Sequence, residues 1–265
     1  MFEIRSGDSV VVGIDGSTAA VYAAHWAVTE AIHRDVPLRL VSCVQGPQRS
    51  DRMSTEYART CLRAAHAAID DTAAQVKIET AVAVGDPTAV LLSESRHAAM
   101  VCVGSVGIGR FAKALLGSTA AEVAARAECP VAVVRNYAPR RRLPAGSIVV
   151  EVNDWEENHD VVAAAVAEAQ LRGRPVFAVG VCPPETGMSA RQELLRRSAM
   201  WQDLCPDVYI TTVPITTSFM RFLQTTPEPI SLVVVGDREA ATLVRIVGSH
   251  ADSNCDNPSV LVARA

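Results

Sequence analysis

The sequence predicts an α/β protein built from two tandem, doubly wound domains, each with a five-stranded parallel sheet. Short Val-rich runs alternate with longer Ala-rich stretches, and this alternation restarts near the middle of the 265-residue chain. Strands that alternate with helices in this way form a parallel sheet with helices on both faces. Aromatic residues make up only 5% of the chain and apolar residues 49%, which favours helices packed on a Val-rich sheet over an all-β sandwich.

The first copy is expected to contain five strands and four helices. Its strands are short apolar or alternating runs, and its helices are Ala-rich stretches with apolar residues at helical spacing. In chain order, the predicted strands cover residues 10–14, 37–44, 76–85, 99–104 and 130–135. The predicted helices between them cover residues 19–34, 57–74, 87–98 and 118–127.

The second copy repeats the strands of the first in the same order. "SIVVEVND" (147–154) matches "SVVVGIDG" (9–16) at an offset of 138 residues. "ISLVVVGD" matches "AAMVCVGS", with Gly236 and Gly104 at an offset of 132. Matched strands in one order indicate a tandem duplication, and the shrinking offset indicates deletions in the second copy.

The segment between the copies has the composition of a linker. Residues 138–146, "APRRRLPAG", contain two prolines and three consecutive arginines. So short a basic cluster is typical of solvated surface rather than of a nucleic-acid-binding patch. The expected domains are therefore residues 1–137 and 147–265.

Composition and charge exclude several classes of protein. The net charge of −4 argues against nucleic acid as a partner, since domains that bind it carry a basic surface. The seven cysteines are scattered without a CxxC pair, so neither a disulfide framework nor a zinc site is predicted. The N-terminus has no leader pattern, and no apolar run reaches the ~18 residues that would span a membrane. We expect a cytoplasmic protein without membrane association.

A glycine-rich segment follows the fourth strand of the first copy: "VCVGSVGIGRFAKALLGSTAAEV". Gly104 ends the strand, Gly107 and Gly109 lie in the loop, and Gly117–Thr119 opens the next helix. Loops at the carboxyl ends of parallel strands form the crevice where ligands bind. Free backbone N–H groups there can hold phosphate oxygens, and a helix N-terminus favours an anion. The alternative for Gly104 and Gly117 is a strand exit and a turn before a helix.

These motifs resemble the nucleotide signature of the universal stress protein family. The resemblance lies in "VVGIDGS" (11–17), with Asp15 after the first strand, and in the spacing of Gly104, Gly107 and Gly117-Ser118. The whole chain is similar to the tandem two-domain form found in mycobacteria and other actinobacteria. The resemblance implies the universal stress protein fold, which is related to the adenine nucleotide alpha hydrolases, and it implies an ATP ligand. The segment is not a P-loop, because GxxxxGK[ST] is absent.

The resemblance also implies a role for each matching residue. Asp15 would lie beside the nucleoside with Gly13 leaving space around it, Val41 would offer backbone groups to the adenine, and Gly85 would lie beside the purine. The residues implied around the triphosphate, which would carry Mg²⁺ on its oxygens, are Gly104, Ser105, Gly107, Gly109, Arg110, Gly117, Ser118 and Thr119. Alternatives remain for two positions: Asp15, in competition with Ser17, could cap the following helix, and Val41 could be plain core.

The second copy departs from this pattern. Asn153 stands in place of Asp15, and Glu151 in place of Gly13. Asp237 and Glu239 follow Gly236, where phosphates would come, and carboxylates repel phosphate. We therefore expect the second copy not to bind nucleotide.

No set of catalytic residues is visible in the sequence. Phosphoryl transfer to water needs a positioned base, metal carboxylates or a cationic clamp at the γ-phosphate, and none is recognisable. We therefore predict an ATP-binding, nucleotide-dependent stress-response module with little or no catalysis, which acts on unidentified protein partners and forms a homodimer. The alternative function is an interaction or scaffold module that has lost nucleotide binding. An enzyme that uses an adenine cofactor ranks last.

Overall fold

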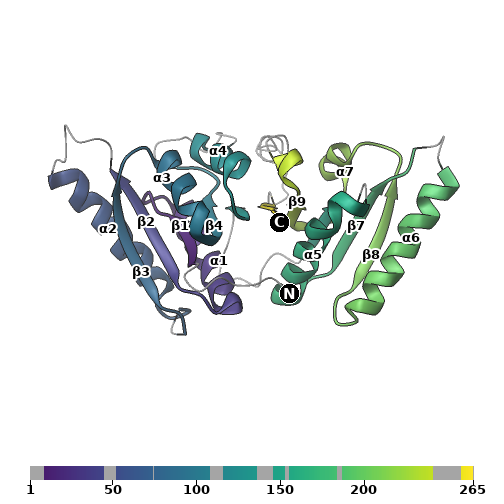
Figure 1. Ribbon diagram of the computed structural model, residues 1–265, viewed down its shortest axis with the longest axis horizontal. Helices are drawn as coiled ribbons and strands as arrows, with labels where there is room; N and C mark the ends of the chain where they lie inside the picture. The colour runs from purple at the N-terminus through teal and green to yellow at the C-terminus, as the bar shows by residue number, and fades with distance from the viewer. Residues whose placement is uncertain are drawn as a thin grey trace. The chain divides into compact units, whose positions relative to one another are not determined.

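In the computed structural model, the chain divides into two compact units, Met1–Arg140 and Arg141–Ala265 (Figure 1). The structure describes residues 9–44, 52–73, 75–107, 116–135, 146–152, 155–183, 187–240 and 258–264. Nearly all of the predicted linker at 138–146 falls outside these ranges, so the exact domain boundaries stay a prediction.

The sheet of the first unit has five parallel strands in the order β3-β2-β1-β4-β5. In chain order they are β1 (Ser9–Gly13), β2 (Leu38–Val44), β3 (Ile78–Val84), β4 (Ala98–Gly104) and β5 (Val131–Val134). From β1 the chain runs outward to β3, then returns to β4 on the other side of β1. The carboxyl ends of β1 and β4 thus form the switch point at which open α/β sheets bind ligands.

Four helices connect the strands of the first unit: α1 (Thr18–Arg34), α2 (Arg52–Ile69), α3 (Pro87–Glu94) and α4 (Ser118–Arg126). Right-handed crossovers place the first two on one face of the sheet and the last two on the other. Helix α1 begins at the N-cap Ser17, whose hydroxyl accepts the Ala20 N–H at 3.1 Å. It ends at Asp35, which takes a left-handed conformation with φ 52°.

Two helices differ from the predicted ranges. The predicted helix at 57–74 is α2, which begins at Arg52 and ends at Ile69. Its first five residues contain one apolar side chain, Met53, which is why the sequence pattern placed the start too late. The predicted helix at 87–98 is α3, which stops at Glu94 and is followed by a short 3₁₀ turn, Ser95–His97, before β4 begins.

The second unit repeats this architecture, with strand order β8-β7-β6-β9-β10 and every pair parallel. Its strands are β6 (Ser147–Glu151), β7 (Val176–Val181), β8 (Ile210–Ile215), β9 (Ile230–Val235) and β10 (Ser259–Val262). Its described helices are α5 (Trp155–Arg172), α6 (Gly187–Leu204) and α7 (Phe219–Thr225). The predicted fold of two doubly wound parallel domains is confirmed.

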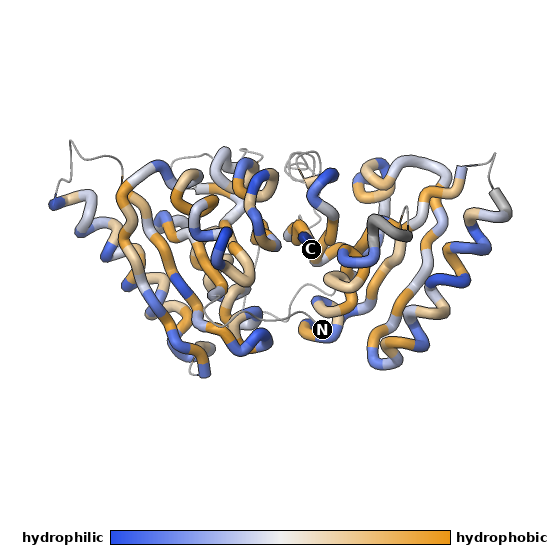
Figure 2. The backbone as a smooth tube through the Cα atoms, viewed as in Figure 1, coloured by the Kyte–Doolittle hydropathy of each residue, from blue (hydrophilic) through white to orange (hydrophobic). Residues whose placement is uncertain are grey.

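The central strands form the core of each unit. Val10–Val12 of β1 and Met100–Cys102 of β4 are fully buried, as are Ile148–Val150 of β6. Figure 2 shows these strands as the apolar interior, with hydrophilic residues along the outer helices. This is the pattern of a parallel sheet covered on both faces. Within the described ranges, no helix combines the length and the apolar character needed to cross a membrane.

Candidate functional site

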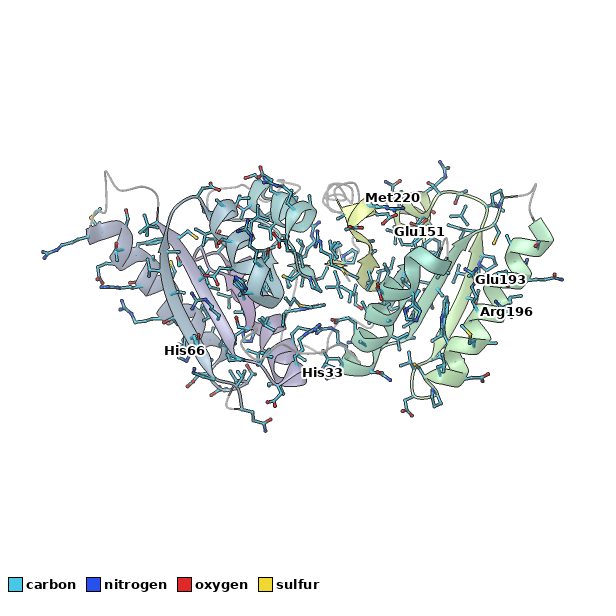
Figure 3. All side chains as sticks on the ribbon, in the orientation of Figure 1. His33, His66, Glu151, Glu193, Arg196 and Met220 are labelled. Atoms are coloured by element: carbon cyan, nitrogen blue, oxygen red, sulfur yellow. The ribbon has the colours of Figure 1, made fainter. Side chains whose placement is uncertain are left out.

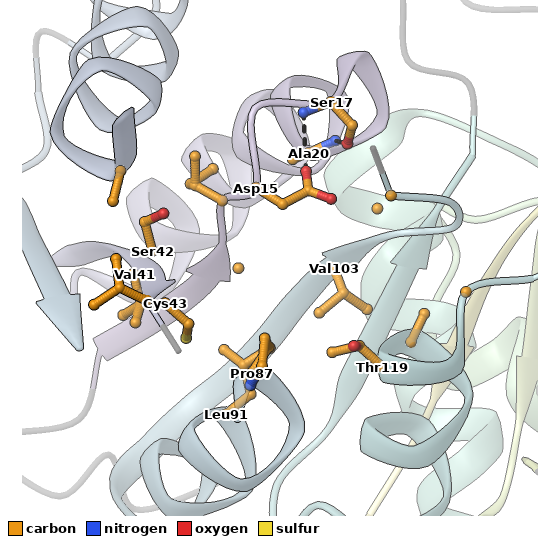
Figure 4. Close-up of a pocket in the computed structure, with 18 of the residues that line it drawn as sticks. Asp15, Ser17, Ala20, Val41, Ser42, Cys43, Pro87, Leu91, Val103 and Thr119 are labelled. Carbon is orange, nitrogen blue, oxygen red and sulfur yellow. Dashed lines mark hydrogen bonds between the residues drawn. The ribbon is translucent and has the colours of Figure 1, made fainter. Parts of the chain in front are cut away.

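A cavity of about 810 Å³ opens at the carboxyl edge of the first unit's sheet (Figure 4). Its walls come from the ends of β1, β2 and β4 and from the first turns of α1 to α4. A volume of this size is in the range of small-molecule sites. Eight of the predicted site residues line it: Gly13, Asp15, Val41, Gly104, Gly107, Gly117, Ser118 and Thr119.

Asp15 lies in the turn between β1 and α1. Its Oδ1 accepts the Ser17 N–H at 2.9 Å, and this bond holds the carboxylate against the turn (Figure 4). Ser17, and not Asp15, is the N-cap of α1. The Ser17 hydroxyl also donates to the carbonyl of Val106 at 3.4 Å. The turn after β1 is therefore tied to the loop after β4, across the switch point.

Two glycines allow close approaches around this turn. A Cβ at Gly107 would lie 2.7 Å from Asp15 Oδ2. A Cβ at Gly104 would lie 2.6 Å from the carbonyl carbon of Ala19 and 2.8 Å from the nitrogen of Ala20. Both distances are shorter than a van der Waals contact, so the glycines let α1 and the carboxylate approach the end of β4.

Helix α4 begins without a side-chain cap, at Gly117. The N-caps of α1, α3 and α7 each accept a backbone N–H with a side-chain oxygen. The first N–H groups of a helix have no acceptor within it. At α4 these belong to Ser118, Thr119 and Ala120, which all line the cavity. The start of α4 therefore offers the cavity backbone donors and the positive end of a helix dipole.

The opposite end of the cavity is mostly apolar. Its apolar lining residues are Val41, Cys43, Val44, Met53, Tyr57, Pro87 and Leu91, and the polar residues Ser42 and Ser54 also line the cavity from β2 and α2. Burial raises the pKa of the Cys43 thiol to about 11, and the nearby carboxylates of Asp86 and Glu94 add to the shift. Cys43 is therefore an uncharged thiol at neutral pH and behaves as part of the apolar wall.

Four predicted site residues do not contribute to the described cavity wall. Gly85 follows β3 at φ 144° and precedes Asp86, the N-cap of α3. Ser105 is buried, and its carbonyl accepts the Gly117 N–H at 2.8 Å. It thus fixes the start of α4 from behind. Gly109 and Arg110 lie outside the described residues.

Sequence reasoning missed the contribution of α2 and most of that of α3. Met53, Ser54 and Tyr57 line the cavity from the first turns of α2, and Pro87 and Leu91 line it from α3. The signal for α3 was available, because Asp-Pro after a strand marks a helix start. The signal for α2 was weaker, because Met53 is the single apolar residue before Tyr57 in its first turns.

Known proteins of one family are similar to this chain. Residues 8–135 match the profile of the universal stress protein family. The chain is 42% identical over 262 residues to universal stress protein Rv2624c of Mycobacterium tuberculosis, covering 97% of this chain and 96% of that protein. The chain belongs to the universal stress protein family.

Two further universal stress proteins are similar over nearly the whole length of this chain. Rv3134c of Mycobacterium tuberculosis is 39% identical over 255 residues and covers 92% of this chain and 93% of its own. The crystal structure of a universal stress protein from Archaeoglobus fulgidus superposes with a TM-score of 0.71 at 14% identity, and it covers 98% of this chain and 97% of its own. This structural likeness extends the universal stress protein fold to both units.

The second unit of this universal stress protein has different side chains at the corresponding edge. Glu151 ends β6 where Gly13 ends β1 (Figure 3). Beyond β9, the Glu239 carboxylate lies over Gly236, with Oε2 3.1 Å from where a Cβ would stand. The segment that contains Gly248 and Ser249 and the position of Asn153 lie outside the described residues.

Proposed function

We propose that the first unit of this universal stress protein binds one adenine nucleotide, with ATP as the expected ligand. The observation that carries the proposal is the uncapped start of α4, which opens on an 810 Å³ cavity beside Gly107 and Gly117. Uncapped helix N-termini beside glycine-rich loops bind phosphate, because several N–H groups and the helix dipole act together.

In this proposal the phosphates lie at the start of α4. The N–H groups of Ser118, Thr119 and Ala120 donate to phosphate oxygens, and the first two residues add hydroxyl donors. Gly107 and Gly117 have no side chain between the backbone and the ligand. A Cβ at Gly117 would lie 3.6 Å from the Ser105 carbonyl oxygen and 3.9 Å from the Gly107 nitrogen, so a branched side chain there would crowd the loop after β4 at the edge of the proposed phosphate site.

Asp15 sets the direction in which the nucleotide lies. A carboxylate repels phosphate but accepts hydrogen bonds from hydroxyl groups, so the sugar is expected beside Asp15. The apolar wall of β2 and α3 then receives the base. Gly13 borders this end, Val41 offers its backbone, and Gly85 shapes the turn into α3 without lining the cavity. The backbone donors of α4, the Asp15 carboxylate and the apolar wall together orient the ligand.

We propose a regulatory role for this binding, with little or no catalysis. Hydrolysis requires a group that positions water in line with the γ-phosphate. Among the described lining residues, the carboxylate is Asp15, which is assigned to the sugar. Mg²⁺, when present, is expected on the phosphate oxygens. The proposed role is that of a cytoplasmic stress-response protein whose nucleotide occupancy alters its contacts with partners, including a second copy of the chain.

The second unit is proposed not to bind nucleotide. Glu239 lies over the glycine that ends β9, where a phosphate would approach, and Glu151 adds a second carboxylate at the end of β6. Carboxylates at a phosphate site oppose binding. The second unit then contributes structure or partner contacts.

The test is isothermal titration of the full chain with ATP. Wild type should bind, and Asp15→Ala and Gly117→Val should each weaken binding by about 30-fold or more, since each removes a charge-assisted bond or blocks the donors. Asp207→Ala, an exposed carboxylate of the second unit, is the matched control and should bind as wild type does. Absence of binding of ATP, ADP and AMP to the wild type would refute the proposal.

A further inference from the structure

We infer that Tyr57 and Met53 of α2 form one wall of the nucleobase site, so that the base lies between them and α3. The inference rests on the proposed function and adds to it the ligand class: a ligand with an aromatic base gains affinity at this wall, and a polyphosphate or a sugar phosphate does not. Neither residue belongs to the motifs that indicated a nucleotide.

The first observation is that two of the exposed large apolar side chains lie in the cavity. In the described part of the chain they are Ile32, Met53, Tyr57, Val84, Leu195, Leu204 and Tyr209. Of these, Met53 and Tyr57 line the cavity. Met53 is 76% exposed and Tyr57 55%. Apolar surface that is wet in a concave site is surface that a ligand can cover at a gain.

The second observation is the arrangement of these side chains on α2. Met53 and Tyr57 are four residues apart, so they lie one above the other on the same face of the helix. The next turn on this face is anchored, because Ala58 and Cys61 are buried. A hydrogen bond with Cys61 raises the pKa of Tyr57, and the carboxylate of Asp15 adds to the shift. The ring is therefore neutral at physiological pH.

The third observation is the wall on the other side. Pro87 and Leu91 are also four residues apart, on α3, and both line the cavity. Figure 4 shows them facing the cavity from α3, with Val41 and Cys43 at the end of β2 beside them. Leu91 is held in place because it is buried and packs against Gly13. Its Cδ1 lies 3.1 Å from the point where a Cβ on residue 13 would stand.

These walls match one part of a nucleotide. A purine has two apolar faces and a polar rim, so it is bound well between an aromatic ring and aliphatic side chains. The sugar and phosphates have no comparable apolar face. Asp15 is the only acidic residue among the described lining residues, and its carboxylate repels a phosphate. The apolar end therefore selects the base, and Tyr57 supplies its aromatic face.

The experiment compares ATP with inorganic tripolyphosphate by isothermal titration of the full chain. Tyr57→Ala should weaken ATP binding by about tenfold, the size expected for loss of one base-stacking contact, and should leave tripolyphosphate binding unchanged. Tyr57→Phe, which keeps the ring, should stay within about twofold of wild type. Tyr209→Ala removes a tyrosine that is 71% exposed in the second unit and should change neither. Because Tyr57 is largely exposed, its truncation should leave the fold intact, as thermal unfolding would verify.

Each contrary outcome has a distinct meaning. If Tyr57→Ala binds ATP as wild type does, or if it binds ATP and tripolyphosphate more weakly by the same factor, Tyr57 is not part of the base wall and the inference is wrong. Nucleotide binding by the first unit would still stand. If tripolyphosphate binds too weakly to detect, Tyr57→Phe decides, since a loss equal to that of Tyr57→Ala contradicts a stacking role. A wild type that binds no adenine nucleotide overturns the proposed function and this inference with it.

Discussion

Replacing Gly104 by alanine is expected to destabilise the protein by about 3 kcal/mol, an overpacking cost at the upper end of the usual range, and to abolish nucleotide binding. The new Cβ would lie 2.6 Å from the Ala19 carbonyl carbon and 2.8 Å from the Ala20 nitrogen. These are backbone atoms of α1, so the clash cannot be relieved by turning a side chain. Helix α1 would have to move away from β4, and the turn that carries Asp15 would move with it. Urea unfolding followed by circular dichroism measures the loss.

The matched control is Gly236→Ala at the corresponding position of the second unit. There the nearest atom to the new Cβ is Glu239 Oε2 at 3.1 Å, followed by a Val161 methyl at 3.5 Å. The end of a glutamate side chain can rotate away, so we expect a change below about 1 kcal/mol. If the two substitutions destabilise the protein equally, the close approach of α1 to β4 is not the reason for a glycine at position 104.

Removing the carboxylate of Glu168 is expected to have a comparably large effect on stability. Glu168 and Arg172 of α5 form an ion pair with Nε 2.6 Å from Oε2, and their side chains are only 3% and 7% exposed. Without Glu168 the guanidinium loses this partner in a buried position. Breaking a buried pair in this way costs about 3–5 kcal/mol, so Glu168→Ala should lower the free energy of unfolding by about 3 kcal/mol.

Glu193→Ala is the control for this prediction. Glu193 of α6 accepts hydrogen bonds from Arg196 and Arg197, which lower the pKa of its carboxyl to about 2. Figure 3 shows Glu193 and Arg196 together on the outer side of α6. Water screens the ion pairs that Glu193 forms with Arg196 and Arg197. Glu193→Ala should therefore lower the free energy of unfolding much less than Glu168→Ala does. A Glu168→Ala variant no less stable than Glu193→Ala would show that burial does not make the α5 pair important.

The fold could be predicted because the apolar pattern of most segments matches the strand or helix that they form. Val10–Val12 and Val131–Val134 are apolar throughout, as a strand buried on both faces requires, and the Ala-rich face of α1 repeats with helical period. The start of α2 could not be predicted for the opposite reason. Residues 52–56 are exposed or half-buried, so packing sets no pattern in them.

The candidate site was predictable where backbone geometry dictates the residue type. Gly104 stands where a Cβ would clash with the backbone of α1, and Gly107 where a Cβ would displace the Asp15 carboxylate, and such positions are visible as glycines in a sequence. Whether Asp15 or Ser17 caps α1 was not predictable, because both residue types cap helices. The apolar wall was not predictable either, since Tyr57 and Leu91 lie on separate helices that only the folded chain brings to one cavity.

The central claim is that one cavity per chain, in the first unit, holds the nucleotide. Native mass spectrometry of the full chain with added ATP tests it most directly. The account predicts a mass increase of one nucleotide per chain, retained in Gly236→Ala and lost in Gly117→Val. Two nucleotides per chain, or one that persists in Gly117→Val, would contradict it.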